Sequence, residues 1–329
     1  MVDKSLNRDD HYVSRTYLKE FISIPKHVFV YRKKEKLEKN MPINSICTAK
    51  GGDICHGLEN IFAVRQVLSN LEPAWNLFIE SVKSKKIIAT NNSTPKEDGL
   101  TLLSRISLYI AYLRCLSPTM VGLGQEQQER ILNDYLLKML AESNHVDLDL
   151  TAKKAILDGK IKARVDDEDY FKARSAGFLG EFGNLIYHRN WEILVNKSST
   201  KFITSDTPCI LPAFLSETHV ALETLAYRKP DPIYLPLTPE YALIIRASLG
   251  RGLSYIELTP SQVRQFNKEI VKSAYDMVIS YKYDSGISVL VNKYRNYHSI
   301  VDFKTLQSPQ GTAIITKQKN VSRETEAFI

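Results

Sequence analysis

One aspartate in this sequence stands where a catalytic carboxylate could be held rigidly. Asp206 follows a short β-forming run, residues 202–205, and precedes Thr207 and Pro208. It therefore lies at the end of a predicted strand, where ladder pairing stops. A carboxylate in this position can orient a water molecule or stabilise a developing positive charge. The position equally suits a structural aspartate that forms an Asx turn or caps the next segment, and both interpretations stay open from this stretch alone.

The charge of the chain indicates a class of partner. The chain has 329 residues, a net charge of +7 and a pI near 9.0. A basic surface attracts polyanions, and nucleic acid is the commonest of these, because neutralising its phosphates releases counterions. A solvated surface is the alternative for each basic stretch taken separately. The lysines and arginines cluster in three runs, at residues 32–39, 83–86 and 153–164.

The composition is that of an ordinary globular protein, with 43% hydrophobic and 25% charged residues. No window approaches roughly eighteen consecutive apolar residues, so we expect no transmembrane helix and no membrane partner. The first residues lack the apolar region of a signal peptide. The cysteines show neither metal-finger nor disulfide-framework spacing, so we expect a cytoplasmic protein without a bound cofactor. They are Cys47, Cys55, Cys115 and Cys209.

Hydrophobic periodicity predicts helices first and strands later. Helices are expected at residues 14–22, 58–84 (divided into two at Pro73), 95–116, 125–141, 151–157, 166–187 and 260–274. Strands are expected at 27–31 and 44–48 as one hairpin, at 191–195 and 202–205 as another, and at 233–237, 241–245, 255–258 and 277–280. This order predicts an α+β fold in which a helical N-terminal half packs on a mostly antiparallel sheet from the C-terminal half. We expect one domain over residues 1–329, helix-rich over 1–188 and strand-rich over 189–303, with a loose polar tail over 304–329.

Several stretches, in order, resemble one family. Residues 11–21, His-Tyr-Val-Ser-Arg-Thr-Tyr-Leu-Lys-Glu-Phe, are similar to the opening signature of the domain of unknown function 4238 family, His-Tyr-x-Pro-Arg-x-Tyr-Leu-x-x-Phe, with Ser14 in place of the usual proline. The resemblance covers nearly the whole chain and so implies one folded unit. Family members occur in bacteria, some near antiviral defence genes, which implies phage DNA, with or without modified bases, as the target. The later stretches that resemble family motifs are Glu72, 110–118, 202–208, 235–239 and Asn267.

The matched motifs supply the side chains of a candidate hydrolytic site. Cleaving a glycosidic bond without a metal needs one carboxylate and an assisting cation or amide, for which we expect Asp206, His11 and Asn267. Guanidinium groups would hold the flanking phosphates, and tyrosines would stack on a flipped base. This inventory predicts a metal-independent DNA glycosylase of antiviral defence. The expected substrate- and phosphate-binding residues are Arg15, Arg114, Tyr12 and Tyr17.

Two further hypotheses stay open. The first is a nuclease that uses a divalent metal held by His11 and Asp206, Glu72 or Glu181. The second is a non-catalytic nucleic-acid-binding or sensor module, in which His11 caps the first helix and Asp206 holds a turn. The surroundings of Asp206 separate these hypotheses, because a catalytic acid must face an opening whereas a structural one is satisfied by main-chain amides.

Overall fold

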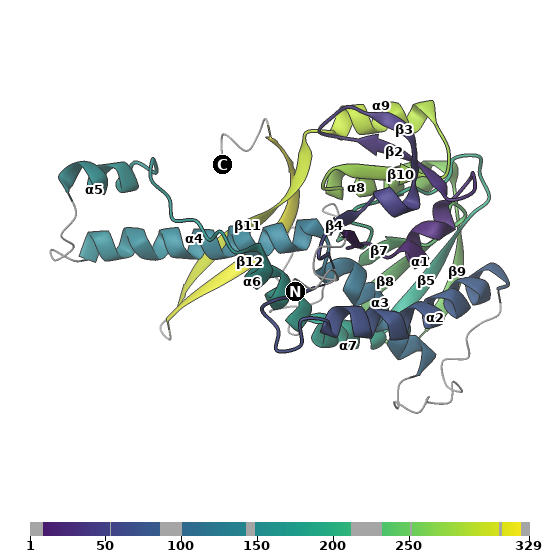
Figure 1. Ribbon diagram of the computed structural model, residues 1–329, viewed down its shortest axis with the longest axis horizontal. Helices are drawn as coiled ribbons and strands as arrows, with labels where there is room; N and C mark the ends of the chain where they lie inside the picture. Colours follow the sequence, from purple (N-terminus) through teal and green to yellow (C-terminus); the bar gives the residue numbers. More distant parts are fainter. Residues whose placement is uncertain are drawn as a thin grey trace, which may run out of the picture.

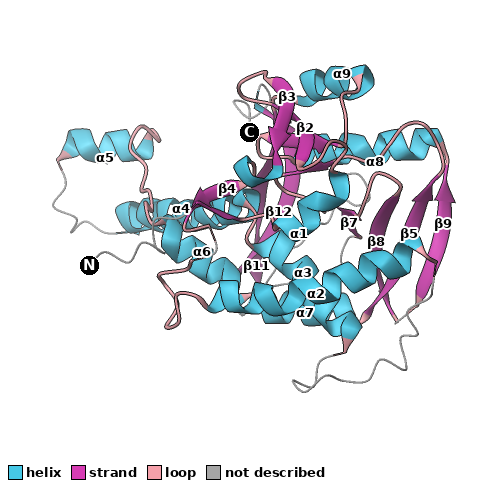
Figure 2. Ribbon diagram, turned by 45° about the vertical axis from the view of Figure 1, so that its right-hand side comes forward, coloured by secondary structure: helices cyan, strands magenta, loops and turns pink. Residues whose placement is uncertain are grey.

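The computed structural model describes residues 9–52, 54–85, 101–142, 149–211, 232–250, 252–308 and 311–323. Within these ranges the protein is a mixed α+β fold, as predicted (Figure 1; Figure 2). The predicted division into a helical half and a sheet half is wrong, because strands also form near the N-terminus and helices also lie between the later strands. Most strand pairs are antiparallel, and β5 with β9 is parallel.

The first four-stranded sheet joins three distant parts of the chain. Its order is β3-β2-β10-β6, with every neighbouring pair antiparallel. The two central strands are apolar and almost wholly buried, which is typical of interior strands. The predicted pairing of residues 27–31 with 44–48 is wrong, because the basic turn leads directly into β3. The strands are β2 (His27–Arg32), β3 (Glu38–Pro42), β6 (Thr204–Ser205) and β10 (Met277–Ser280).

The second four-stranded sheet has the order β7-β8-β5-β9. Here β5 lies between two partners and is buried along most of its length. The predicted hairpin of residues 191–195 with 202–205 is therefore wrong, since β5 belongs to this sheet and β6 pairs with β10 in the other. The strands are β5 (Arg189–Asn196), β7 (Ile233–Pro236), β8 (Tyr241–Leu249) and β9 (Leu253–Leu258).

Two smaller strand pairs complete the sheets. β1 (Asp9–His11) pairs with β4 (Thr48–Lys50), and β11 (Tyr297–Ser308) pairs along its whole length with β12 (Gly311–Ser322). The expected loose tail over 304–329 is thus a β-hairpin as far as Ser322, because paired main-chain groups satisfy one another even in a polar sequence. Residues 324–329 lie outside the described ranges.

The helix α3 (Leu102–Cys115), predicted over residues 95–116, is the central core helix. Almost all of its residues are buried, and the ring of Tyr109 stacks on Trp75 of α2 (Ala63–Lys83) with centroids 4.7 Å apart. In the described ranges no single helix is long and apolar enough to span a membrane; only α3 together with Pro118–Leu140, bent by 60°, reaches that length and composition. The predicted start of this helix at residue 95 lies outside the described residues, and Thr101 caps α3.

The remaining helices flank this core. The helix predicted over 166–187 is two helices, α6 and α7, which meet at Phe178. α7 packs against α3, with Gly183 facing Leu108. These helices are α1 (Arg15–Leu18), α4 (Pro118–Glu142), α5 (Leu150–Leu157), α6 (Glu168–Gly177), α7 (Leu179–Tyr187), α8 (Pro260–Ser273) and α9 (Ser285–Tyr294).

The predicted break of α2 at Pro73 is wrong, because the helix runs on through the proline. A proline in a helix interior removes one hydrogen bond and costs about 3 kcal/mol. The residues around it, Leu71, Ala74, Trp75 and Phe78, are all buried. Burying an apolar side chain of this size stabilises by about 1.5–3 kcal/mol, so packing outweighs the proline.

We predict that Gly52→Ala destabilises the protein by about 1–3 kcal/mol. A methyl group at Gly52 would lie 2.3 Å from the main-chain oxygen of Asp10, so β1 and β4 would have to separate. Urea denaturation measures the change. The control is Gly122→Ala in α4, where a methyl group meets nothing within 4 Å and should stabilise by roughly 0.5–1 kcal/mol. Equal stability of both variants would contradict the close approach at Gly52.

Candidate functional site

The segment around Asp206 lies in the interior of the protein. Residues 202–210 are buried without interruption, and Asp206 itself has 0% of its surface exposed. The segment contributes β6 to the first sheet and a bridge from Ile210 to Tyr234 of the second. It therefore connects the two large sheets at a place with little access to solvent.

Three main-chain N–H groups hold the Asp206 carboxylate. Tyr275 donates to Oδ1 over 2.9 Å, and Asp276 and Met277 donate to Oδ2 over 2.8 and 2.7 Å. Burial raises the pKa of Asp206 to about 6, while these hydrogen bonds and the charge of Lys33 oppose that rise. Each of the two oxygens has at least one main-chain donor, which is the environment of a structural carboxylate.

Lys33 is the buried cation near Asp206. Its ammonium group donates to the main-chain oxygens of Val271, Ala274 and Tyr297 over 3.0, 2.8 and 2.7 Å. Burial lowers the pKa of Lys33 to about 8, and the negative charge of Asp206 counteracts this. In the sequence this lysine belongs to the basic run at residues 32–39, for which a surface that attracts polyanions and a merely solvated surface were both open. The one feature of the sequence that indicates its burial is its position directly after β2, whose four central residues are buried.

Hydroxyl groups from other elements bind the same segment. The Tyr17 hydroxyl lies 2.6 Å from Thr204 Oγ1 and donates to the Pro236 main-chain oxygen over 2.8 Å. The Thr119 hydroxyl lies 2.7 Å from that of Thr207. Tyr17 was predicted to stack on substrate, but it is fully buried and its ring packs against aromatic core side chains.

Asn267 and Arg114 also attach to this segment through main-chain groups. The Asn267 amide accepts from the Ile203 N–H over 3.2 Å and donates to the Lys201 oxygen over 2.8 Å. Arg114 donates to the Cys209 oxygen over 3.2 Å and also to the Gln318 side chain. Burial lowers the pKa of Arg114. Both side chains link α-helices to the 202–210 segment, and each is almost wholly buried.

His11 and Tyr12 lie beside this region, on and after β1. The His11 Nε2 and the Ile43 oxygen are 2.9 Å apart. Tyr12 contacts Cys47, and burial together with the nearby charges of Cys47 and Asp206 raises the pKa of its hydroxyl. Tyr12 thus lies within electrostatic range of Asp206, while the imidazole of His11 contacts the main chain at Ile43.

The other predicted residues lie apart from Asp206. Arg15 is exposed, and its guanidinium donates to Asn44 over 3.4 Å. Glu72 accepts a hydrogen bond from Ser14, and Glu181 is exposed on α7. Across the described ranges no three His, Cys, Asp or Glu side chains are close enough together to hold a metal ion. The predicted residues therefore divide between buried links and separate surface positions.

The family assignment follows from the whole sequence. The model of one protein family, described as "Protein of unknown function (DUF4238)", matches residues 10–284. The chain belongs to this family. No curated protein and no solved structure matches the chain. The DUF4238 match includes His11, Arg114, Asp206 and Asn267, and in this structure the last three bind main-chain groups of the interior. Their catalytic and substrate-binding roles stay predictions.

We predict that Asp206→Asn destabilises the protein, because an amide N–H would face main-chain N–H groups and lose one or more hydrogen bonds. The expected cost is about 2–4 kcal/mol, with a melting temperature lower by several degrees. The matched control is Asp284→Asn. Asp284 caps α9 by accepting from the Gly286 and Ile287 N–H groups, and asparagine caps equally well. A folded Asp206→Asn protein with unchanged melting temperature would contradict the structural role.

Proposed function

We propose that this protein binds nucleic acid through a basic and aromatic surface formed by α8, α9 and the start of β11. We call this surface the α8–α9 basic face. Its position outside the buried Asp206 region favours the hypothesis of a binding or sensor module over catalysis by Asp206. It comprises Arg264, Lys268, Lys272, Lys293 and Arg295, with the rings of Tyr294 and Tyr297.

The arrangement of lysines around one tyrosine carries the proposal. The ammonium groups of Lys268, Lys272 and Lys293 lie 5.7, 5.4 and 5.5 Å from the centroid of the Tyr294 ring. Lys272 also lies 5.3 Å from the centroid of Tyr297. Three like charges at one ring repel one another, and an incoming polyanion relieves that repulsion.

The sequence places these charges through helix geometry. Arg264, Lys268 and Lys272 recur at intervals of four, so they follow one side of α8. The opposite side buries Val263 and Ile270 in the core. The three basic runs singled out from the sequence do not include this stripe, because its members are separated by other residues. A search for lysines at helical spacing would have found it.

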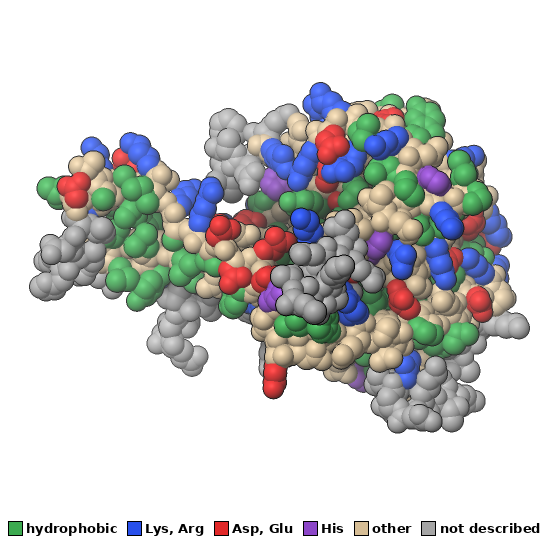
Figure 3. Space-filling view, viewed as in Figure 1, with side chains coloured by type: hydrophobic (Ala, Val, Ile, Leu, Met, Phe, Trp, Pro, Cys, Tyr) green, Lys and Arg blue, Asp and Glu red, His purple; other side chains and the backbone are tan. Residues whose placement is uncertain are grey.

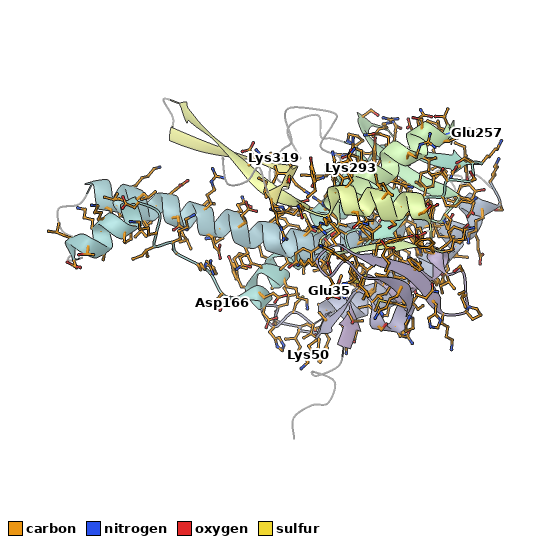
Figure 4. The ribbon with its side chains drawn as sticks, turned by 90° about the horizontal axis from the view of Figure 1, so that it is seen from above. Glu35, Lys50, Asp166, Glu257, Lys293 and Lys319 are labelled. Carbon is orange, nitrogen blue, oxygen red and sulfur yellow. The ribbon has the colours of Figure 1, made fainter. Side chains whose placement is uncertain are left out.

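The net charge of the face remains positive after the ion pair between Lys272 and Glu269 is counted. Glu269 is almost fully buried, and it lies 3.8 Å from the Lys272 ammonium group. Burial raises the pKa of Glu269, while Lys272 and Lys268 oppose that rise. One buried carboxylate thus faces several cations, and Lys293 stands on the neighbouring helix α9 (Figure 4).

The chemistry of this face suits a single strand. Lysines neutralise phosphates without regard to sequence, and half-buried tyrosine rings offer a surface for stacking with bases. Duplex DNA presents phosphates but keeps its bases stacked inside. We therefore expect single-stranded DNA or RNA to bind more tightly than duplex. The setting in bacterial antiviral defence, with phage DNA as the target in the cytoplasm, remains part of this proposal and rests on the family resemblance.

Base excision and metal-dependent cleavage stay predictions. Base excision through Asp206 would require the carboxylate to leave its three amide donors and reach a sugar. An assay for abasic sites in EDTA, on phage DNA with modified bases, tests it directly. Abasic sites that disappear in Asp206→Asn, with the fold intact, would restore the glycosylase hypothesis.

We predict that Lys268→Gln with Lys293→Gln weakens binding of a fluorescent single-stranded 20-mer. Loss of two phosphate contacts should reduce the slope of log affinity against log salt by roughly 1–2. Fluorescence anisotropy across a salt series measures both effects. The control is Lys83→Gln with Lys85→Gln at the end of α2, which removes the same charge elsewhere. No binding by the unchanged protein, or an equal loss in the control, would overturn the proposal.

We predict that Tyr294→Leu weakens single-strand binding by roughly 5- to 100-fold, because stacking contributes about 1–3 kcal/mol per base. Tyr294→Phe keeps the ring and should bind nearly as the unchanged protein does. Duplex binding should change little in either variant. If the Tyr294→Leu and Tyr294→Phe variants bind the single strand with the same affinity in the anisotropy assay, Tyr294 does not stack on a base.

A further inference from the structure

A long arm projects from the body of the protein. α4 has 25 residues and is roughly 37 Å long at 1.5 Å per residue. Its first turns are buried in the body, whereas its later part extends away with α5 at the far end (Figure 1). The chain then returns toward the body at α6. We call α4, α5 and residues 158–167 the arm.

Specific hydrogen bonds build the arm as a defined element. The Asn133 side chain donates to the Ala163 oxygen over 2.9 Å and accepts from its N–H over 2.7 Å. Gln125 donates to the Val165 oxygen over 2.9 Å. These side chains of α4 thus fix the returning segment along the helix. Leu140 and Ile156 are buried where α5 meets α4.

The arm nevertheless leaves large apolar side chains exposed. Leu132, Tyr135, Leu136 and Met139 recur at i, i+3, i+4 and i+7, so they form one stripe along α4. Tyr135 is 62% exposed. A contiguous exposed apolar stripe on a projecting helix is typical of an interaction surface. Further exposed apolar side chains on the arm are Leu137, Leu150, Leu157 and Ile161.

Charge is distributed unevenly along the arm. The described distal part carries four lysines, Lys153, Lys154, Lys160 and Lys162, against two acids, Asp149 and Asp158, of which Asp158 lies 3.4 Å from Lys160. Where the arm joins the body, four consecutive acids, residues 166–169, are exposed after the single cation Arg164. Figure 3 shows red side chains near that junction, both blue and red side chains farther out, and apolar ones between them. Lysines thus outnumber acids at the far end of the apolar stripe, and acids outnumber cations at its base.

We propose that the occupant of this stripe is a second copy of the same chain, whose arm lies antiparallel to the first. A two-fold axis across the stripe would place the basic end of each arm against the acidic base of the other. The apolar stripes would then cover each other. This pairing is favoured because a single arm carries both halves of the complementary charge pattern.

Sedimentation velocity of the full chain from about 1 to 100 µM tests the pairing, since dimer formation depends on concentration. We expect a dimer, and Tyr135→Glu with Met139→Glu should raise its dissociation constant about tenfold or more. Val67→Glu with Leu77→Glu on α2, where both side chains are exposed, is the matched control and should remain dimeric. Circular dichroism confirms that each variant is folded.

Charge reversal tests the antiparallel arrangement. Lys153→Glu with Lys154→Glu, or Asp166→Lys with Asp169→Lys, should each weaken the dimer by repulsion. All four changes together restore opposite charges across the pair and should restore the dimer. Asp167 is left unchanged because it caps α6. A monomer throughout the concentration range, a dimer insensitive to the stripe variants, or a failure of the fourfold variant to recover would each overturn the proposal.

Discussion

The fold depends on the way in which one buried carboxylate and one buried ammonium group fix the end of α8. Asp206 accepts from the main-chain N–H groups just after the helix, and Lys33 donates to main-chain oxygens of its last turn. A cation at a helix C-terminus interacts favourably with the helix dipole. Neither charge could be buried alone, because an unpaired ion in the interior is costly. Together they attach β2, β6 and β10 to α8.

Several residues of the family motifs therefore lie in this interior and hold it together. Arg114, Asp206 and Asn267 come from different parts of the chain and bind the same segment or its neighbours. Their recurrence in a family pattern is what a shared fold requires, whatever its members bind. The features that fit a partner, the α8–α9 basic face and the arm, lie on the surface and partly outside the recognised motifs. The residues that hold the fold together are thus different from those of the two proposed binding surfaces.

Local patterns in the sequence predicted most helices and strands. They failed to predict which strands pair when the partners are far apart in the chain. The helices expected from residues 14 and 260 begin at the local caps Ser14 and Thr259, because a cap depends only on residues a few positions away. The partners of β5 and β6 depend on which sheet each strand joins, which no local pattern specifies. Pro73 was misjudged because packing against α3 outweighs helix propensity. The burial of Lys33 could not be predicted, because the main-chain oxygens that bind its ammonium group belong to residues more than two hundred positions away.

The large sequence separations of the interior links have a kinetic consequence. Tyr17 meets Thr204 across 187 positions, and Arg114 meets Cys209 across 95. Contacts of this kind form only after long loops close, so they slow folding and leave partly formed sheets exposed meanwhile. During synthesis the early strand β2 must wait for β10, its central partner, to leave the ribosome. The protein is therefore expected to acquire its native sheet late, after translation of residue 280.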